Sequence, residues 1–136
     1  MKKILATVLV LVILVASLSS CSLFDKYSAR YEYVSAESYG EYSQMRGTLD
    51  FIYVETFLKI YGDGSWNIDV DSFIPIGSPL DKGTYTKSGD TYKFTGFEYG
   101  LETYGEETED GGFVIYMKAP YHSSVTNAIV LNFKKA

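Results

Sequence analysis

The sequence predicts an all-β domain, a small antiparallel up-and-down (meander) β-barrel, preceded by a cleaved signal peptide. Two observations indicate the barrel. Hydrophobic side chains alternate with a period of two along most of the chain after residue 21, and short turns rich in Gly and Asp separate the alternating stretches. A third observation, an apolar run directly after two lysines, indicates the signal peptide. A chain of 136 residues is long enough for one domain.

The N-terminal segment has the layout of a secretion signal. Lys2 and Lys3 form a positive start, and residues 4–16 are uncharged and almost wholly apolar. A helix that crosses a bilayer needs about 20 apolar residues, whereas the apolar region of a signal peptide has about 7–15. We therefore expect a signal peptide over residues 1–20. The alternative is an N-terminal membrane anchor that stays uncleaved.

Residues 18–21, at the end of this apolar run, form a second recognisable motif. Leu18-Ser19-Ser20-Cys21 resembles the lipobox of bacterial lipoproteins, in which an aliphatic residue and two small residues precede a cysteine. The resemblance implies a diacylglycerol thioether on Cys21, cleavage before this residue and acylation of its amine. A thiol is a suitable nucleophile for such a link. The alternative is a lone buried or free cysteine in an ordinary secreted protein.

Two or three acyl chains would anchor the protein stably in a membrane. We therefore expect a cell-envelope protein, lipid-anchored to a bacterial membrane, with its domain on the periplasmic or extracellular side. By family analogy, Ser22 implies sorting to the outer membrane if the host has two membranes. The lipidated Cys21 and a short tether occupy residues 21–26, and five extended residues reach less than about 20 Å. The domain, over residues 27–136, is expected to lie near the bilayer.

The strands are expected in order along this domain. Residues 65–71 alternate in polarity, residues 57–61 are expected as the strand before them, and the turn at 62–64 between the two is a strong hairpin signal. Residues 83–87 and 91–95 repeat the design around a turn at 88–90. Five further strands are expected at residues 31–35, 49–54, 97–103, 112–118 and 128–134, with one longer loop around Pro75 and Pro79. Such a meander can close into a barrel without exposed edges; an open two-layer sandwich is the alternative.

Three segments resemble small lipocalin-like domains of bacterial lipoproteins. They are IYGDGSWNI, DKGTYTKSGDTYKFTG and IVLNFKK, and together they cover about residues 56–134. The resemblance implies a barrel that holds a small apolar or amphipathic molecule. The side chains expected to line its interior are Trp66, Ile68, Tyr85, Tyr92 and Phe94. The same five residues would also describe a filled core without a ligand. A short match to the Gly-x-Trp signature of true lipocalins at residues 64–66 is treated as coincidence, because it follows an earlier strand.

The composition excludes several classes of function. A formal net charge of -5 argues against nucleic acid as a partner. One Cys and one His exclude disulfide scaffolds and sites built on several imidazoles. His122 lies next to two serines in a loop, and adjacent residues do not form a hydrolytic triad. We expect no enzyme activity and no cofactor.

Two acidic segments contain the oxygen ligands that hard metal ions prefer. The alternating Asn67, Asp69 and Asp71 lack the Gly and Glu that an EF-hand loop requires at its sixth and twelfth positions. A second stretch, which includes Glu98, Glu102, Glu106, Glu107, Glu109 and Asp110, has no basic residue among these acids. Solvated charge explains both, so we expect no metal site; weak calcium binding by the second stretch is a hypothesis.

The compositional exception is tyrosine, with 13 residues in the chain. Tyrosine suits half-buried strands as well as ligand pockets and protein interfaces. We expect a membrane-anchored, non-catalytic bacterial lipoprotein that binds a small apolar ligand. The alternative is an envelope-surface protein–protein interaction module with a filled core. The expected partners are the membrane, through acyl chains on Cys21, and either that ligand or an envelope protein.

Overall fold

A computed structural model describes residues 28–70 and 81–136 of the chain. The predicted signal peptide, the lipidation of Cys21 and the tether lie outside the described residues. The predicted loop around Pro75 and Pro79 also lies outside them.

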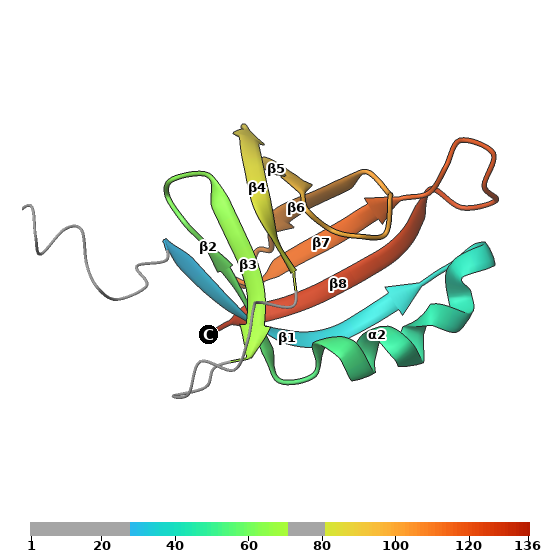
Figure 1. Cartoon of the computed structure of the whole chain (residues 1–136), viewed down its shortest axis with the longest axis horizontal. Coiled ribbons are helices and arrows are strands. Elements are labelled where there is room, and N and C mark those ends of the chain that lie inside the picture. The colour runs from blue at the N-terminus through green and yellow to red at the C-terminus, as the bar shows by residue number, and fades with distance from the viewer. Residues whose placement is uncertain (1–27, 71–80) are drawn as a thin grey trace, which may run out of the picture.

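The described residues form eight antiparallel strands that close into a barrel (Figure 1). Each strand pairs with the next along the chain, and β1 pairs with β8, so the expected up-and-down barrel is confirmed and the open sandwich is wrong. The strands are β1 (Ala29–Ser38), β2 (Thr56–Ile60), β3 (Ser65–Val70), β4 (Asp81–Ser88), β5 (Thr91–Thr95), β6 (Thr103–Glu107), β7 (Phe113–Lys118) and β8 (Asn127–Lys135).

The two ends of the barrel differ. Tight turns at residues 61–64, 89–90 and 108–112 form one end, here called the hairpin end. The first described residue, Ser28, also lies there, where its backbone N–H donates to the carbonyl of Ile60 at 2.7 Å. The opposite end, here called the helix end, carries the 3-10 helix η1 (Gly40–Met45) and the α-helix α2 (Arg46–Tyr53). It also carries the loops at residues 96–102 and 119–126 (Figure 1).

The strand predicted at residues 49–54 is wrong, because this segment forms most of helix α2. Leu49 and Tyr53 are four residues apart, so they lie on one side of a helix, and both are buried. A strand would place Phe51 on the same face as these two residues, whereas Phe51 is 82 % exposed. Glu55 then adopts a left-handed φ of 60°, which turns the chain from the helix into β2.

The strand predicted at residues 97–103 is also wrong, apart from its last residue. Gly96 and Gly100 have φ values of 116° and 69°, which are not those of an extended strand. Residues 96–102 therefore form a loop, and β6 begins only at Thr103. Phe97 leaves the sheet and stacks on Trp66, with the ring centroids 4.3 Å apart.

Candidate functional site

The residues predicted to line the barrel differ in burial. Trp66, Ile68, Tyr92 and Phe94 are buried, and Tyr85 is half-buried. The Trp66 indole N–H donates to the carbonyl oxygens of Thr84 and Thr95 at 3.1 and 2.9 Å. This buried donor is therefore satisfied by the barrel's own backbone.

Aromatic side chains pack against one another inside the barrel. The ring of Phe94 lies 5.7 Å from that of Trp66, 6.0 Å from that of Tyr92 and 6.0 Å from that of Phe113, measured between centroids. These separations are typical of packed aromatic pairs. Because the rings touch one another, they occupy the space that a ligand would need.

The interior of the barrel has no room for a side chain at Gly105 of β6. Gly105 faces the interior, and a Cβ atom there would lie 2.6 Å from a ring carbon of Phe113 and 2.7 Å from one of Phe94. Both distances are shorter than a carbon–carbon contact allows. Even a methyl group does not fit at this position, so the centre of the barrel is a filled core.

Open hollows lie at the hairpin end. One of about 400 Å³ has Tyr31, Glu107 and Lys135 in its lining, and a neighbouring one of about 370 Å³ is lined by charged residues that include Lys87 and Glu109. The Tyr31 hydroxyl donates to Glu107 at 3.1 Å. Burial, and then the nearby carboxylate, raise the pKa of Tyr31. Both hollows are open to solvent and lined in part by charged side chains, so neither is the enclosed apolar cavity expected of a carrier.

The acidic stretch is divided between the two ends of the barrel. Glu98 and Glu102 lie at the helix end, whereas the other four acids lie toward the hairpin end. Among the described residues, no three His, Cys, Asp or Glu side chains are grouped so that they could hold a metal ion. The calcium hypothesis therefore has no support from this part of the chain.

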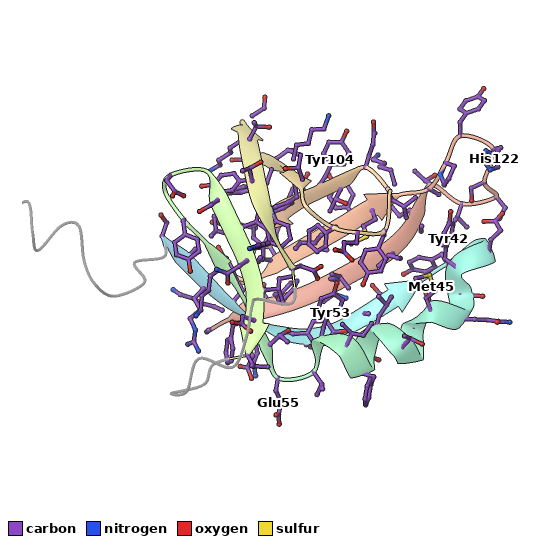
Figure 2. The ribbon with its side chains drawn as sticks, in the orientation of Figure 1. Tyr42, Met45, Tyr53, Glu55, Tyr104 and His122 are labelled. Atoms are coloured by element: carbon purple, nitrogen blue, oxygen red, sulfur yellow. The ribbon has the colours of Figure 1, made fainter. Side chains whose placement is uncertain are left out.

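The serines beside His122 serve a structural contact. Ser123 Oγ donates to Glu41 Oε2 at 2.6 Å, and the N–H and Oγ of Ser124 donate to Glu41 Oε1 at 3.0 and 2.9 Å. These bonds, that of Ser123 first, lower the pKa of Glu41 to about 2. They fix the loop at 119–126, which carries His122 (Figure 2), to η1.

A buried polar cluster joins α2 to the barrel. The hydroxyl of Tyr53 donates to Asp81 Oδ2 at 2.7 Å and lies 2.9 Å from the hydroxyl of Tyr99. Figure 2 shows Tyr53 on the inner side of α2, beside the strands. Burial raises the pKa of Asp81, and the nearby charge of Glu98 raises it further, against the lowering effect of the Tyr53 hydrogen bond.

The helix end also exposes apolar side chains that the sequence analysis missed. Phe51 is 82 % exposed, Val54 is 56 % exposed and Ile52 is 38 % exposed. Residues 49–54 are rich in aromatic and β-branched side chains, which favour a strand, so the outward face of the helix was not predicted. The spacing of Leu49 and Tyr53 is the signal that could have identified the helix and its outward face.

Within the described residues, no helix is both long and apolar enough to cross a bilayer. Searches against protein-family models, curated protein sequences and solved structures found no match to this chain.

Proposed function

We propose that this chain is a lipid-anchored, non-catalytic protein of the bacterial cell envelope whose filled barrel presents its outer surface to a protein partner. The observation that carries the proposal is the packed interior around Trp66, Phe94 and Phe113. Of the two functions expected from the sequence, it favours the interaction module over the carrier. A barrel filled by its own side chains is a scaffold, and function then resides on its surface.

Anchoring is supported by the likeness of residues 18–21 to a lipobox. If Cys21 carries the acyl chains, the seven residues from Ser22 to Ser28 span at most about 25 Å. Ser28 lies at the hairpin end, so this end would lie toward the membrane and the helix end away from it. Anionic lipid would repel the carboxylates of the hairpin end, so the acyl chains would hold the protein there.

The helix end offers the contact surface for a protein partner. Phe51, Ile52 and Val54 lie on or directly after α2 and are exposed. Aromatic side chains such as Phe51 are enriched at the centres of protein interfaces, and Ile52 and Val54 extend the exposed apolar surface around it. A position away from the membrane would leave these three side chains accessible to another protein.

The lipocalin-like description is a further part of this proposal. Eight strands in sequential up-and-down order, closed between β1 and β8, support it. The ligand that such a likeness implies would have to displace packed aromatic rings. For this reason the proposal keeps the fold likeness and replaces the ligand with a protein partner.

Anchoring is tested by expressing the full chain and a Cys21→Ser variant in a bacterial host fed with radiolabelled palmitate. The wild-type chain should incorporate label and fractionate with membranes, whereas Cys21→Ser should not be labelled. Label that remains in Cys21→Ser, or wild-type protein that is unlabelled, would refute lipidation at this residue.

The filled barrel is tested by native mass spectrometry of the full chain released from detergent micelles. The expected result is the mass of the acylated protein alone. A discrete additional mass that disappears on denaturation would instead establish a carrier, and its identity would give the ligand class.

Partner contact is tested by placing a photo-crosslinking amino acid at position 51 of the full chain in cells. A discrete crosslinked protein is expected there, and it should be absent at the matched exposed position 109 of the hairpin end. Loss of this product in a Val54→Glu variant would support the surface. Equal crosslinking at both positions would argue against it.

A further inference from the structure

Two tyrosines form a pair on the outer wall of the barrel. Tyr104 of β6 is the cross-strand partner of Tyr116 of β7, and their ring centroids are 5.9 Å apart with an interplanar angle of 22°. The neighbours of each tyrosine within its strand are buried in the barrel, so both rings face outward. Tyr104 is labelled in Figure 2. The pair is half-buried, and its rings are nearly parallel and stacked.

The polar tips of this pair are already bound. The hydroxyl of Tyr104 donates to Glu102 at 3.3 Å, and that of Tyr116 donates to Glu106 at 3.3 Å. Both bonds hold the rings in position. The Nζ atom of Lys118 lies 5.9 Å from each ring centroid, at the outer limit of a cation–π contact. Its ammonium group is exposed and can donate to a ligand.

A surface hollow of about 500 Å³ adjoins the tyrosine pair, because Glu102 and Lys118 line the hollow and also contact the pair. The rest of its lining comes from the two loops of the helix end and is largely apolar: Gly100, Leu101, Ala119, Pro120 and Tyr121. Its volume lies within the range of about 300–1,000 Å³ that is typical of small-molecule sites. Tyr121 is fully exposed, in the loop that Glu41 fixes to η1.

We propose that this hollow and the adjoining Tyr104–Tyr116 pair bind a neutral oligosaccharide. The face of a tyrosine ring is negatively polarised and attracts the weakly positive C–H groups of a sugar ring. The carboxylate of Glu102 can accept hydrogen bonds from sugar hydroxyls, and the ammonium of Lys118 can donate to them. Aromatic faces beside such groups provide the two kinds of contact that a saccharide makes.

The charge around the surface favours a neutral ligand. Glu102 and Glu106 border it with two negative charges, while Lys118 and Lys93, the cross-strand neighbour of Tyr104, supply two positive ones. An anion or a cation would therefore meet a like charge next to each opposite one. A proline-rich peptide also packs on aromatic grooves, but proline has no N–H to donate to the carboxylates of Glu102 and Glu106, whereas sugar hydroxyls can donate to them. Both phenolic hydroxyls of the pair are already committed to carboxylates.

This inference goes beyond the proposed function and does not depend on it. The site lies on the wall of β6 and β7 and the two loops beside it, whereas the proposed protein contact uses α2. A negative result in the lipidation or crosslinking experiment would not count against saccharide binding. A negative result in the saccharide experiment would likewise not count against lipidation or partner contact.

The test is isothermal calorimetry on the full chain, kept in a detergent without a sugar headgroup. The probes are maltohexaose, cellohexaose and chitohexaose at millimolar concentration. At least one should bind, and Tyr121→Ala and Tyr116→Ala should each weaken that binding at least about tenfold. Val34→Ala, which shortens an exposed apolar side chain on β1, outside both proposed binding surfaces, should leave it unchanged.

Three outcomes would overturn the proposal. They are no heat with any of the three sugars, equal binding by the wild type and Tyr121→Ala, and binding of decaproline at this site in place of a sugar. Tyr121 is fully exposed, so its replacement leaves the fold intact and keeps the comparison valid even if Tyr116→Ala unfolds.

Discussion

The hydroxyl of Tyr33 donates a hydrogen bond of 2.6 Å to Oδ1 of Asp50, which joins strand β1 to helix α2. The same oxygen accepts the backbone N–H of Ala36 at 3.0 Å. Strand β2 pairs with β1 only along residues 29–32. The C-terminal part of β1, residues 33–38, therefore has no strand partner at the edge where β2 pairs. One carboxylate on the helix therefore binds the strand at the point where its neighbour ends.

Asp50→Ala is expected to destabilise the protein by about 1–3 kcal/mol, because the backbone N–H of the buried Ala36 and the Tyr33 phenol lose their acceptor. The measurement is the free energy of unfolding in urea. The hydrogen bond from Tyr33 is the main cause of the lowered pKa of Asp50. The stabilisation from Asp50 should therefore be present above its ordinary pKa and be lost as the pH falls through the lower, folded-state pKa. Tyr33→Phe should raise the pKa of Asp50, and an unchanged pKa would contradict this account.

Asp81 should show the opposite dependence on pH. Its pKa is raised by burial and then by Glu98, so the folded protein binds a proton more tightly than the unfolded chain does. Its contribution is complete below the ordinary Asp pKa and is lost as the pH rises through the higher, folded-state pKa. Asp81→Asn keeps an acceptor for Tyr53 and cannot ionise. The difference in unfolding free energy between Asp81→Asn and wild type should therefore grow in favour of the variant over this pH window. A constant difference would refute the raised pKa.

The contact between Glu41 and the loop at 119–126 can be measured directly. Glu41 should titrate with a pKa of about 2 in carbon-detected NMR spectra. Replacing Ser123 and Ser124 together with Ala removes two hydroxyl donors and should shift this pKa toward the ordinary Glu value. Hydrogen exchange of the Ser124 amide should also become faster in Glu41→Ala. Unchanged exchange would show that this carboxylate does not fix the loop.

The close approach at Gly105 gives a test of the filled interior. Gly105→Ala should destabilise the protein by about 1–3 kcal/mol, because the methyl group would overlap the rings of Phe94 and Phe113. The matched control is Gly47→Ala in α2, where the added carbon has no atom within 4 Å apart from its chain neighbours and the helix's own backbone. The control should stabilise the protein by about 0.4–1 kcal/mol. A Gly105→Ala variant as stable as wild type would reveal free space inside the barrel.

Tyr92→Ala tests the same interior by removing volume. Tyr92 is buried, and its ring packs against those of Phe94 and Phe113. A filled core predicts a loss of about 3–5 kcal/mol in unfolding free energy, measured by thermal or urea denaturation. Tyr121→Ala, at a fully exposed position, should change stability by less than about 0.5 kcal/mol. A loss for Tyr92→Ala as small as that of the control would favour a ligand cavity.

The two tight hairpins could be predicted from local sequence because each is specified by neighbouring residues. The strands on either side of residues 62–64 and 88–90 begin and end within one residue of the expected positions, with two exceptions. One is the start of β4. The other is the end of the strand expected at residues 65–71, whose last residue lies outside the described residues. Turn residues and alternation act over about ten positions, so the sequence carries both signals in one place.

Helix α2 could not be predicted in the same way. Residues 49–54 are rich in aromatic and β-branched side chains, which favour a strand, and only the buried Leu49 and Tyr53 have the helical spacing. Their burial depends on partners far along the chain, since Tyr53 binds Asp81 and Tyr99. The outward position of Phe51 follows from the same helix and was missed for the same reason.

The sequence by itself determined the strand alternation, the principal turns and the antiparallel meander, because these depend on residues close together in the chain. Only the tertiary structure decided that β1 and β8 close the barrel and that aromatic rings fill it. It also decided that α2 binds the part of β1 that does not pair with β2. It also brought Tyr104, Tyr116 and the hollow beside Tyr121 to one surface. These features depend on contacts between residues far apart in the chain. Alternation along one strand shows which side chains share a face, but it does not show which side chains they contact across the barrel.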